Sequence, residues 1–172
     1  MISKEPTNLF AKSWNAFSKE HAQGYLKSIG NPAPNSKKIL LDLLLREQKE
    51  NIRLLDLGCG NAQLLEYFQA GGLRCQYTGI DISLPLLEAA RAAHPNATFI
   101  EDDLSRLEKV PGDFDVAIFS HVIEMLSSPE MSLSRARALA RKVMIRFYEP
   151  PEFEFDLIDL QELDVGNGNK MP

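Results

Sequence analysis

The sequence predicts an α/β protein with a doubly wound, mostly parallel sheet. From residue 52 onwards, short apolar segments alternate with helical segments, which is typical of parallel strands joined by right-handed crossover helices. The apolar segments are almost entirely hydrophobic, as expected for strands that helices cover on both faces. A chain of 172 residues is long enough to bury the core of one such domain.

Two helical segments are expected before the first strand. Phe10, Trp14 and Phe17 recur at helical spacing near the N-terminus, and residues 37–50 place apolar side chains on one helical face. Between them, the stretch 30–35 is rich in glycine, proline and asparagine, which interrupt helices. The first helical segment is therefore separate from the part of the chain that follows.

Turn-forming and capping residues mark the ends of the later elements. We expect strands at residues 52–57, 77–80, 97–101, 114–119 and 143–148, and helices at residues 62–70, 85–93 and 129–140. Gly71 and Gly72 end the first of these helices. Ser83 is expected to cap the second helix, which ends before His94 and Pro95.

Composition and charge exclude several classes of protein. A net charge of −5 with scattered basic residues argues against a nucleic-acid partner. Cys59 and Cys75 supply neither a disulfide framework nor a zinc site, which favours a reducing, cytoplasmic setting. Residues 1–8 lack the apolar core of a signal peptide, and no stretch has the length of a membrane span. We therefore expect no membrane partner.

The strongest chemical feature is a glycine turn after the first strand. The strand carries Asp56 near its end and runs directly into Gly58 and Gly60 before the next helix begins. Glycines let the backbone approach a ligand closely, and the free N–H groups of the helix point towards it. The alternative is that these glycines only permit a tight turn.

A second acidic residue, Asp81, closes the second strand about twenty residues beyond the glycine turn. At this offset an acidic residue accepts hydrogen bonds from ribose hydroxyls in Rossmann-like nucleotide sites. Its alternative role is to cap the following helix, for which Ser83 is better placed. The glycine turn and Asp81 together predict a site for a nucleoside-containing cofactor.

The glycine pattern favours S-adenosylmethionine over a dinucleotide. Dinucleotide sites use G-x-G-x-x-G, whereas the sixth position counted from Gly58 is Gln63. Asp56 would repel a pyrophosphate but tolerates a cofactor that carries an ammonium and a sulfonium group. An NAD-dependent oxidoreductase remains the weaker alternative.

Four motifs, in order, resemble those of class I S-adenosylmethionine-dependent methyltransferases of the small-molecule branch. They are Asp56-Leu57-Gly58-Cys59-Gly60, Gly79-Ile80-Asp81-Ile82-Ser83, Thr98-Phe99-Ile100-Glu101-Asp102-Asp103-Leu104 and the segment 114–124. One departure is Ala62, where many members carry a third glycine. The resemblance implies a Rossmann-like sheet with strand order 3-2-1-4-5 and a cofactor at the carboxyl ends of the strands.

The resemblance also implies which residues hold the cofactor. They are Asp56, Gly58, Gly60, Asn61, Asp81, Ile82, Asp102, Asp103, Leu104 and Ser120. Asp103 aligns best with the acidic residue that faces the adenine amino group, and Asp102 is adjacent. No further ligand cluster accompanies the acidic run 101–103, so we expect no bound metal.

Methyl transfer needs alignment more than covalent help, because the sulfonium already activates the methyl group. His121, just after the fourth strand, is the best-placed general base, and its alternative role is to line the pocket through its backbone. The Asn/Asp-Pro-Pro-aromatic motif of enzymes that methylate amide or base amino groups is absent after this strand, so we expect a small-molecule acceptor. The other alternative is a partner protein that binds the cofactor but is catalytically weak.

These features divide the chain into an N-terminal helical lid segment (1–36), a cofactor-binding methyltransferase core (37–149) and a C-terminal extended tail (150–172). Family members usually end their sheet in an antiparallel hairpin. The tail offers one alternating segment, 153–157, and its stretch 164–169 is too rich in turn formers for another strand. We therefore expect a fragment or shortened variant without the hairpin. The edge of its fifth strand would be covered by residues 153–157 or by a second copy of the chain, giving a homodimer.

Overall fold

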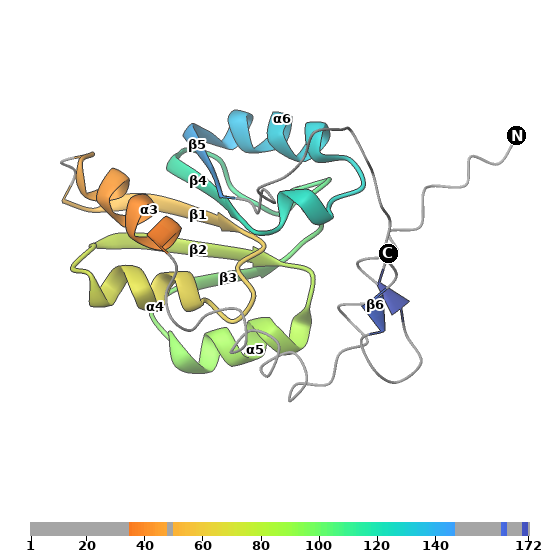
Figure 1. Cartoon of the computed structure of the whole chain (residues 1–172), viewed down its shortest axis with the longest axis horizontal. Helices are drawn as coiled ribbons and strands as arrows, with labels where there is room; N and C mark the ends of the chain where they lie inside the picture. Colours follow the sequence, from red (N-terminus) through yellow and green to blue (C-terminus); the bar gives the residue numbers. More distant parts are fainter. Residues whose placement is uncertain (1–34, 48–49, 147–162, 165–169, 172) are drawn as a thin grey trace, which may run out of the picture.

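A computed structural model describes residues 35–47, 50–146, 163–164 and 170–171 of the chain (Figure 1). Most of the expected lid segment (1–36) and tail (150–172) lies outside the described residues. The same holds for the helix expected around Phe10, Trp14 and Phe17, and for the alternating segment 153–157.

Five parallel strands form the central sheet, in the order β3-β2-β1-β4-β5. Their bounds are β1 (Ile52–Leu57), β2 (Cys75–Asp81), β3 (Thr98–Glu101), β4 (Phe114–Ser120) and β5 (Ala140–Arg146). Every neighbouring pair is parallel, so all five carboxyl ends lie at one edge of the sheet. The predicted fold class and strand order are confirmed.

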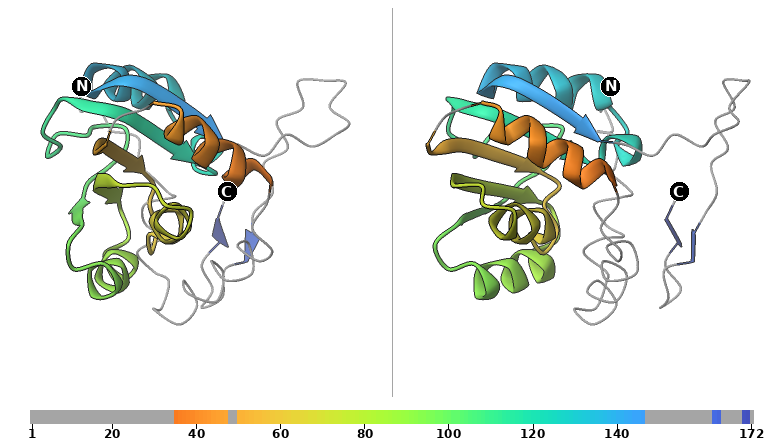
Figure 2. Two further views of the ribbon diagram at one scale, coloured as in Figure 1. Left: turned by 90° about the vertical axis from the view of Figure 1, so that its left-hand side faces the viewer. Right: turned by 60° about the vertical axis from the view of Figure 1, so that its left-hand side comes forward.

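Helices cover both faces of this sheet (Figure 2). They are α3 (Asn35–Leu45), α4 (Gln63–Ala70), α5 (Leu84–Ala93) and α6 (Pro129–Leu139), and the short turn η1 (Ile123–Met125) follows β4. One buried apolar cluster joins the sheet to α3, α4 and α5, through side chains such as Leu44, Phe68 and Leu87. The other cluster joins it to α6 through Ala136. No helix among the described residues is long and apolar enough to cross a membrane.

Strand β5 begins earlier than the sequence predicts. Instead of a helix to residue 140 and a strand from residue 143, α6 ends at Leu139 and the extended backbone starts at Ala140, which pairs with Phe114. The basic side chains of Arg141 and Lys142 obscured this boundary, because they resemble the cationic end of a helix. In the strand, Arg141 instead forms an ion pair with Asp115 of β4.

A second, separate sheet consists of β6 (Leu163–Asp164) and β7 (Lys170–Met171), which pair antiparallel with each other. The prediction that the stretch 164–169 contributes no strand is therefore wrong for Asp164, because glycine and asparagine disfavour a strand but do not prevent pairing beside them. Neither short strand pairs with β5, so within the described residues β5 is an edge of the main sheet.

Candidate functional site

The glycine turn after β1 is joined to the carboxyl end of β2. The N–H groups of Gly58 and Cys59 both donate to the carbonyl of Ile80, at 2.8 and 2.9 Å. Gly58 has a φ of 81°, and a Cβ at this position would lie 2.6 Å from Cγ2 of Val122. Glycine is needed here both for the left-handed backbone and for the close approach of the segment after β4.

Asp81 fastens this turn from the neighbouring strand. Its carboxylate accepts hydrogen bonds from the N–H of Gly60 (2.8 Å) and from the N–H of Ser83 (2.9 Å). Burial raises the pKa of Asp81, and these backbone donors lower it. Ser83 occupies the N-cap position of α5, but its side chain makes no capping hydrogen bond. The prediction is therefore right in position and wrong about the side-chain cap. Asp81 remains partly exposed and has lone pairs left for a ligand.

Asp56 lies beneath the glycine turn, 1% exposed. Its Oδ2 accepts a 2.6 Å hydrogen bond from the hydroxyl of Tyr77. Burial raises the pKa of Asp56 to about 7, opposed by the Tyr77 hydrogen bond and assisted by the charge of Asp81. Among the described residues, its Oδ1 is buried without a hydrogen-bond partner, as is Oδ1 of Asn61 in the turn itself. Such orphaned acceptors cost about 1–3 kcal/mol each, so they suit a ligand that donates hydrogen bonds here.

The two acidic residues after β3 organise their own loop. Asp102 is 8% exposed, and its two oxygens accept from the backbone N–H groups of Asp103 and Lys109. Asp103 accepts from both the N–H and the hydroxyl of Ser105. Leu104 is buried in the core between them. Asp103 and Ile82 are partly exposed, whereas Asp102 is engaged within the loop.

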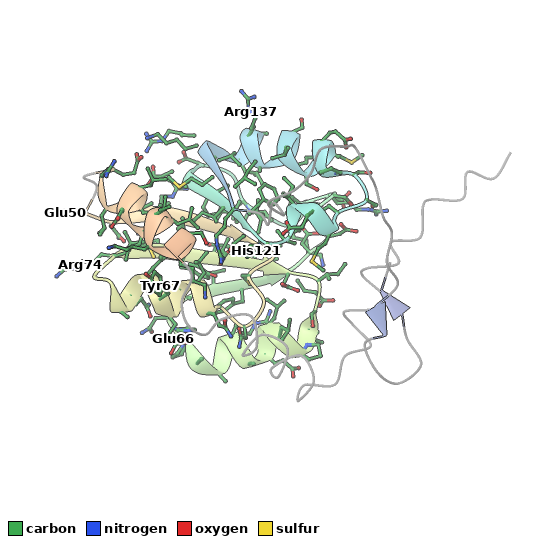
Figure 3. The ribbon with its side chains drawn as sticks, in the orientation of Figure 1. Glu50, Glu66, Tyr67, Arg74, His121 and Arg137 are labelled. Atoms are coloured by element: carbon green, nitrogen blue, oxygen red, sulfur yellow. The ribbon has the colours of Figure 1, made fainter. Side chains whose placement is uncertain are left out.

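A polar group follows β4 at the same edge of the sheet (Figure 3). His121 has a φ of 53°, a left-handed conformation that non-glycine residues rarely adopt outside functional or strained positions. Its N–H donates to the carbonyl of Arg146, and its Nδ1 lies 3.3 Å from Oε1 of Glu124. The hydroxyl of Ser120 accepts from Nη1 of Arg146 at 2.8 Å.

Sequence reasoning missed two cationic residues that the fold brings to this group. Arg146 ends β5, and Lys37 lies in the first turn of α3. The available signal was a charged residue inside the otherwise apolar strand predicted at residues 143–148. Within the described residues, no three His, Cys, Asp or Glu side chains come together as a metal site would require.

The arrangement of strand ends, glycine turn and acidic partners matches known proteins. A family model described as a methyltransferase domain matches residues 32–151. A protein of Mycobacterium tuberculosis described as a methyltransferase is 34% identical over 94 residues, which is 51% of this chain and 57% of that protein. The ubiquinone/menaquinone biosynthesis C-methyltransferase of Campylobacter jejuni is 25% identical over 99 residues, 55% of this chain and 42% of that protein.

Solved structures share the fold. The plantazolicin methyltransferase in complex with a desmethyl analogue and S-adenosylhomocysteine superposes with a TM-score of 0.62 at 20% identity, covering 77% of this chain and 52% of that one. The magnesium protoporphyrin IX methyltransferase of Synechocystis, with bound S-adenosylmethionine, gives a TM-score of 0.61 at 15% identity, covering 80% and 74%. The chain spans about half the length of the curated relatives named above.

The fold and the glycine turn define a class I S-adenosylmethionine-dependent methyltransferase domain. With the family model matching most of its length, the chain belongs to the methyltransferase domain family. The residues present also fit this cofactor, since the orphaned acceptors of Asp56 and Asn61 are suited to an ammonium group, and a pyrophosphate would meet the same oxygens unfavourably. The NAD-dependent alternative is therefore set aside.

Proposed function

We propose that this domain transfers the methyl group of S-adenosylmethionine to a small-molecule acceptor bound beside the carboxyl end of β4. The observation that carries the proposal is the His121–Glu124 pair. His121 has a left-handed backbone, and the pair flanks Val122, which packs against Gly58 of the glycine turn. The cofactor supplies an activated methyl group when bound. The residues of the chain position the reactants and handle the proton.

In this proposal the glycine turn and Asp81 hold the nucleoside and amino-acid parts of the cofactor. Asp81 accepts the ribose hydroxyls with the lone pairs that Gly60 and Ser83 leave free. Asp56 and Asn61 offer their unpartnered oxygens to the ammonium. The loop after β3, with Ile82, is assigned to the adenine. Its partly exposed carboxylate, Asp103, is better placed for this role than Asp102.

His121 is assigned the role of general base. A hydrogen bond from Nδ1–H to Glu124 fixes the tautomer in which Nε2 is free to accept a proton from a hydroxyl or ammonium acceptor. In the alternative, His121 lines the pocket only through its backbone. Only its carbonyl would then be available, because its N–H already donates to the carbonyl of Arg146.

A small acceptor is supported by two further observations. The C. jejuni relative is named for ubiquinone/menaquinone biosynthesis, which involves a small molecule. The segment after β4 lacks the Asn/Asp-Pro-Pro-aromatic motif. We also propose a reducing, cytoplasmic setting, because Cys59 and Cys75 are both free thiols.

The test is transfer of radiolabelled methyl groups from S-adenosylmethionine to extracted small molecules, and separately to DNA, RNA and folded protein. We expect label only in the small-molecule fraction, and a loss of about 10²–10⁴-fold in kcat for His121→Ala. Label in nucleic acid or protein would contradict the acceptor class. Cofactor binding with no label in any fraction would favour the alternative of a catalytically weak partner protein.

A further inference from the structure

Two cationic side chains are buried where the first turn of α3 meets the carboxyl end of β5. Arg146 is 8% exposed and Lys37 is 9% exposed, and we call them the buried cation pair. Burial lowers the pKa of Lys37, and repulsion by Arg146 lowers it further. Burial likewise lowers the pKa of Arg146, whose guanidinium nonetheless keeps its proton near neutral pH. Buried like charges are costly unless an anion compensates them.

Neither cation has a carboxylate partner within the part of the chain that the structure describes. Arg146 donates from Nε to the hydroxyl of Ser36 and from Nη1 to the hydroxyl of Ser120, each at 2.8 Å. Both partners are neutral. Lys37 forms no hydrogen bond or ion pair among these residues.

Two acidic side chains act on the buried cation pair only from a distance. Glu66 of α4 raises the pKa of Lys37, and Glu124 of η1 raises that of Arg146. Glu66 is exposed, and Glu124 is paired with His121. These carboxylates weaken the repulsion, but they do not contact the cations.

The backbone adds further positive potential at the same place. Helix α3 has 11 residues, and the hydrogen bond between Ser36 and Arg146 sets its first turn against the end of β5. The positive end of the helix dipole therefore lies beside the buried cation pair, and the first turn contains no acidic residue. An anion would meet two charged side chains and a helix N-terminus.

We propose that the buried cation pair and the N-terminus of α3 bind a carboxylate group of a molecule that takes part in methyl transfer. Guanidinium geometry matches a carboxylate, and Lys37 adds a second charged donor. Ser36 and Ser120 hold the guanidinium in position. The inference rests on the proposed function for the identity of that molecule, because the pair borders the segment after β4.

Two molecules can supply the carboxylate. One is the cofactor, through its amino-acid end, and the other is the acceptor. Strands in a sheet lie about 4.8 Å apart. Asp81 on β2 and Ser120 on β4 are separated only by β1, so one extended cofactor can reach from one to the other. The chemistry at the buried cation pair is the same in both cases, and binding experiments distinguish them.

The experiment compares Lys37→Met and Arg146→Gln with matched controls. Lys38→Met removes an exposed lysine next in α3, and Arg137→Gln removes an exposed arginine of α6. Calorimetry measures the binding of S-adenosylhomocysteine and of 5′-methylthioadenosine, which lacks the amino-acid end. Melting of the S-adenosylhomocysteine complex is then followed with and without benzoate, a simple carboxylate, at constant ionic strength.

If the carboxylate belongs to the cofactor, both variants lose at least ten-fold in affinity for S-adenosylhomocysteine and none for methylthioadenosine. If it belongs to the acceptor, S-adenosylhomocysteine binds all variants alike, but benzoate raises the Tm of the wild type and the controls and not of the two variants. The proposal is overturned if the variants behave as the controls do, or if both nucleosides weaken equally. These experiments measure only binding, so their outcome does not depend on whether a methylated acceptor is found in the test of the proposed function.

Discussion

At the scale of single residues, Asp56 is the clearest case of a buried acidic side chain whose ionisation lowers stability. It is buried, has one unpartnered oxygen, and has its pKa raised to about 7 by burial. An acid whose pKa is higher in the folded state contributes most to folding stability at pH values below its unfolded pKa. The contribution is lost as pH rises through the folded pKa. For Asp56 this window runs from 3.8 to about 7.

Ionisation of Asp56 is expected to lower the free energy of unfolding as the pH rises from 3.8 to about 7. Asp56→Asn should abolish this loss. Asparagine keeps an acceptor for the Tyr77 hydroxyl and carries no charge to bury. Urea unfolding of the ligand-free domain at pH 5 and pH 8 should show a gain for the variant at pH 8, up to a few kcal/mol. A variant that is less stable than the wild type at pH 8 would contradict this account. The same change should weaken S-adenosylhomocysteine binding, because the ammonium loses a charged partner.

Asp81 is proposed to bind the cofactor, and it also accepts hydrogen bonds from the glycine turn and from Ser83. Removing its carboxylate should therefore have two effects. Asp81→Ala should weaken S-adenosylhomocysteine binding about ten- to hundred-fold through the lost ribose contacts. It should also destabilise the ligand-free domain by about 1–3 kcal/mol, since the N–H groups of Gly60 and Ser83 lose their acceptor. Calorimetry and urea unfolding measure these separately, with Asp42→Ala, which removes an exposed acid of α3, as a control outside the site. Unchanged affinity would remove Asp81 from the cofactor site.

Contacts that follow from the spacing of motif residues were the easier ones to predict. The spacing of Gly58, Gly60 and Asp81 predicted that they meet. In the structure Gly60 donates directly to Asp81, and Gly58 donates to the carbonyl of the preceding residue, Ile80. The engagement of Asp102 by two backbone N–H groups could not be predicted, because it depends on how the loop returns to Lys109.

At the scale of elements, the segment after β4 packs directly on the glycine turn. Gly58→Ala would combine left-handed strain with a clash against Val122, whereas Gly72→Ala would meet the same strain at φ 86° with nothing within 4 Å. We expect a cost of about 1–2 kcal/mol at Gly72 and a larger cost at Gly58. Val122→Ala in the Gly58→Ala background should recover only part of the extra cost at Gly58, because Cβ of residue 122 would still lie 2.9 Å from the added methyl group. Equal costs at both glycines, measured by urea unfolding, would show that the contact is unimportant.

The exposed edge of β5 motivates the proposal of a homodimer. Ile145 is 42% exposed on this strand, and an open apolar edge favours pairing with another chain. We expect light scattering to give a dimer mass for the wild type and a monomer mass for Ile145→Lys. A monomeric wild type with protected β5 amides would instead favour coverage of the edge by the chain's own tail.

Element boundaries were less predictable than element types. The start of β5 was misplaced because Arg141 and Lys142 resemble a helix end, while their partners Asp115 and Glu47 are known only from the fold. A local pattern cannot report a charge that is neutralised by a distant segment.

At the scale of the whole molecule, the alternation of apolar strands and helices predicted the layers, and the resemblance to class I methyltransferases predicted the strand order. The buried cation pair was not predictable in the same way. The hydrogen bond from Arg146 to Ser36 joins residues 110 positions apart, so the buried cation pair exists only after α3 has packed against β5. Sequence motifs therefore predicted the residues proposed to hold the cofactor, and the fold added the buried cation pair.

The most direct test of the central claim is calorimetric titration of the purified domain with S-adenosylhomocysteine and, in parallel, with NADH. The glycine turn, the Asp81 carboxylate and the orphaned acceptors of Asp56 and Asn61 predict micromolar binding of S-adenosylhomocysteine and no measurable heat with NADH. Binding of NADH, or no binding of S-adenosylhomocysteine by a folded sample, would contradict the assignment of this site.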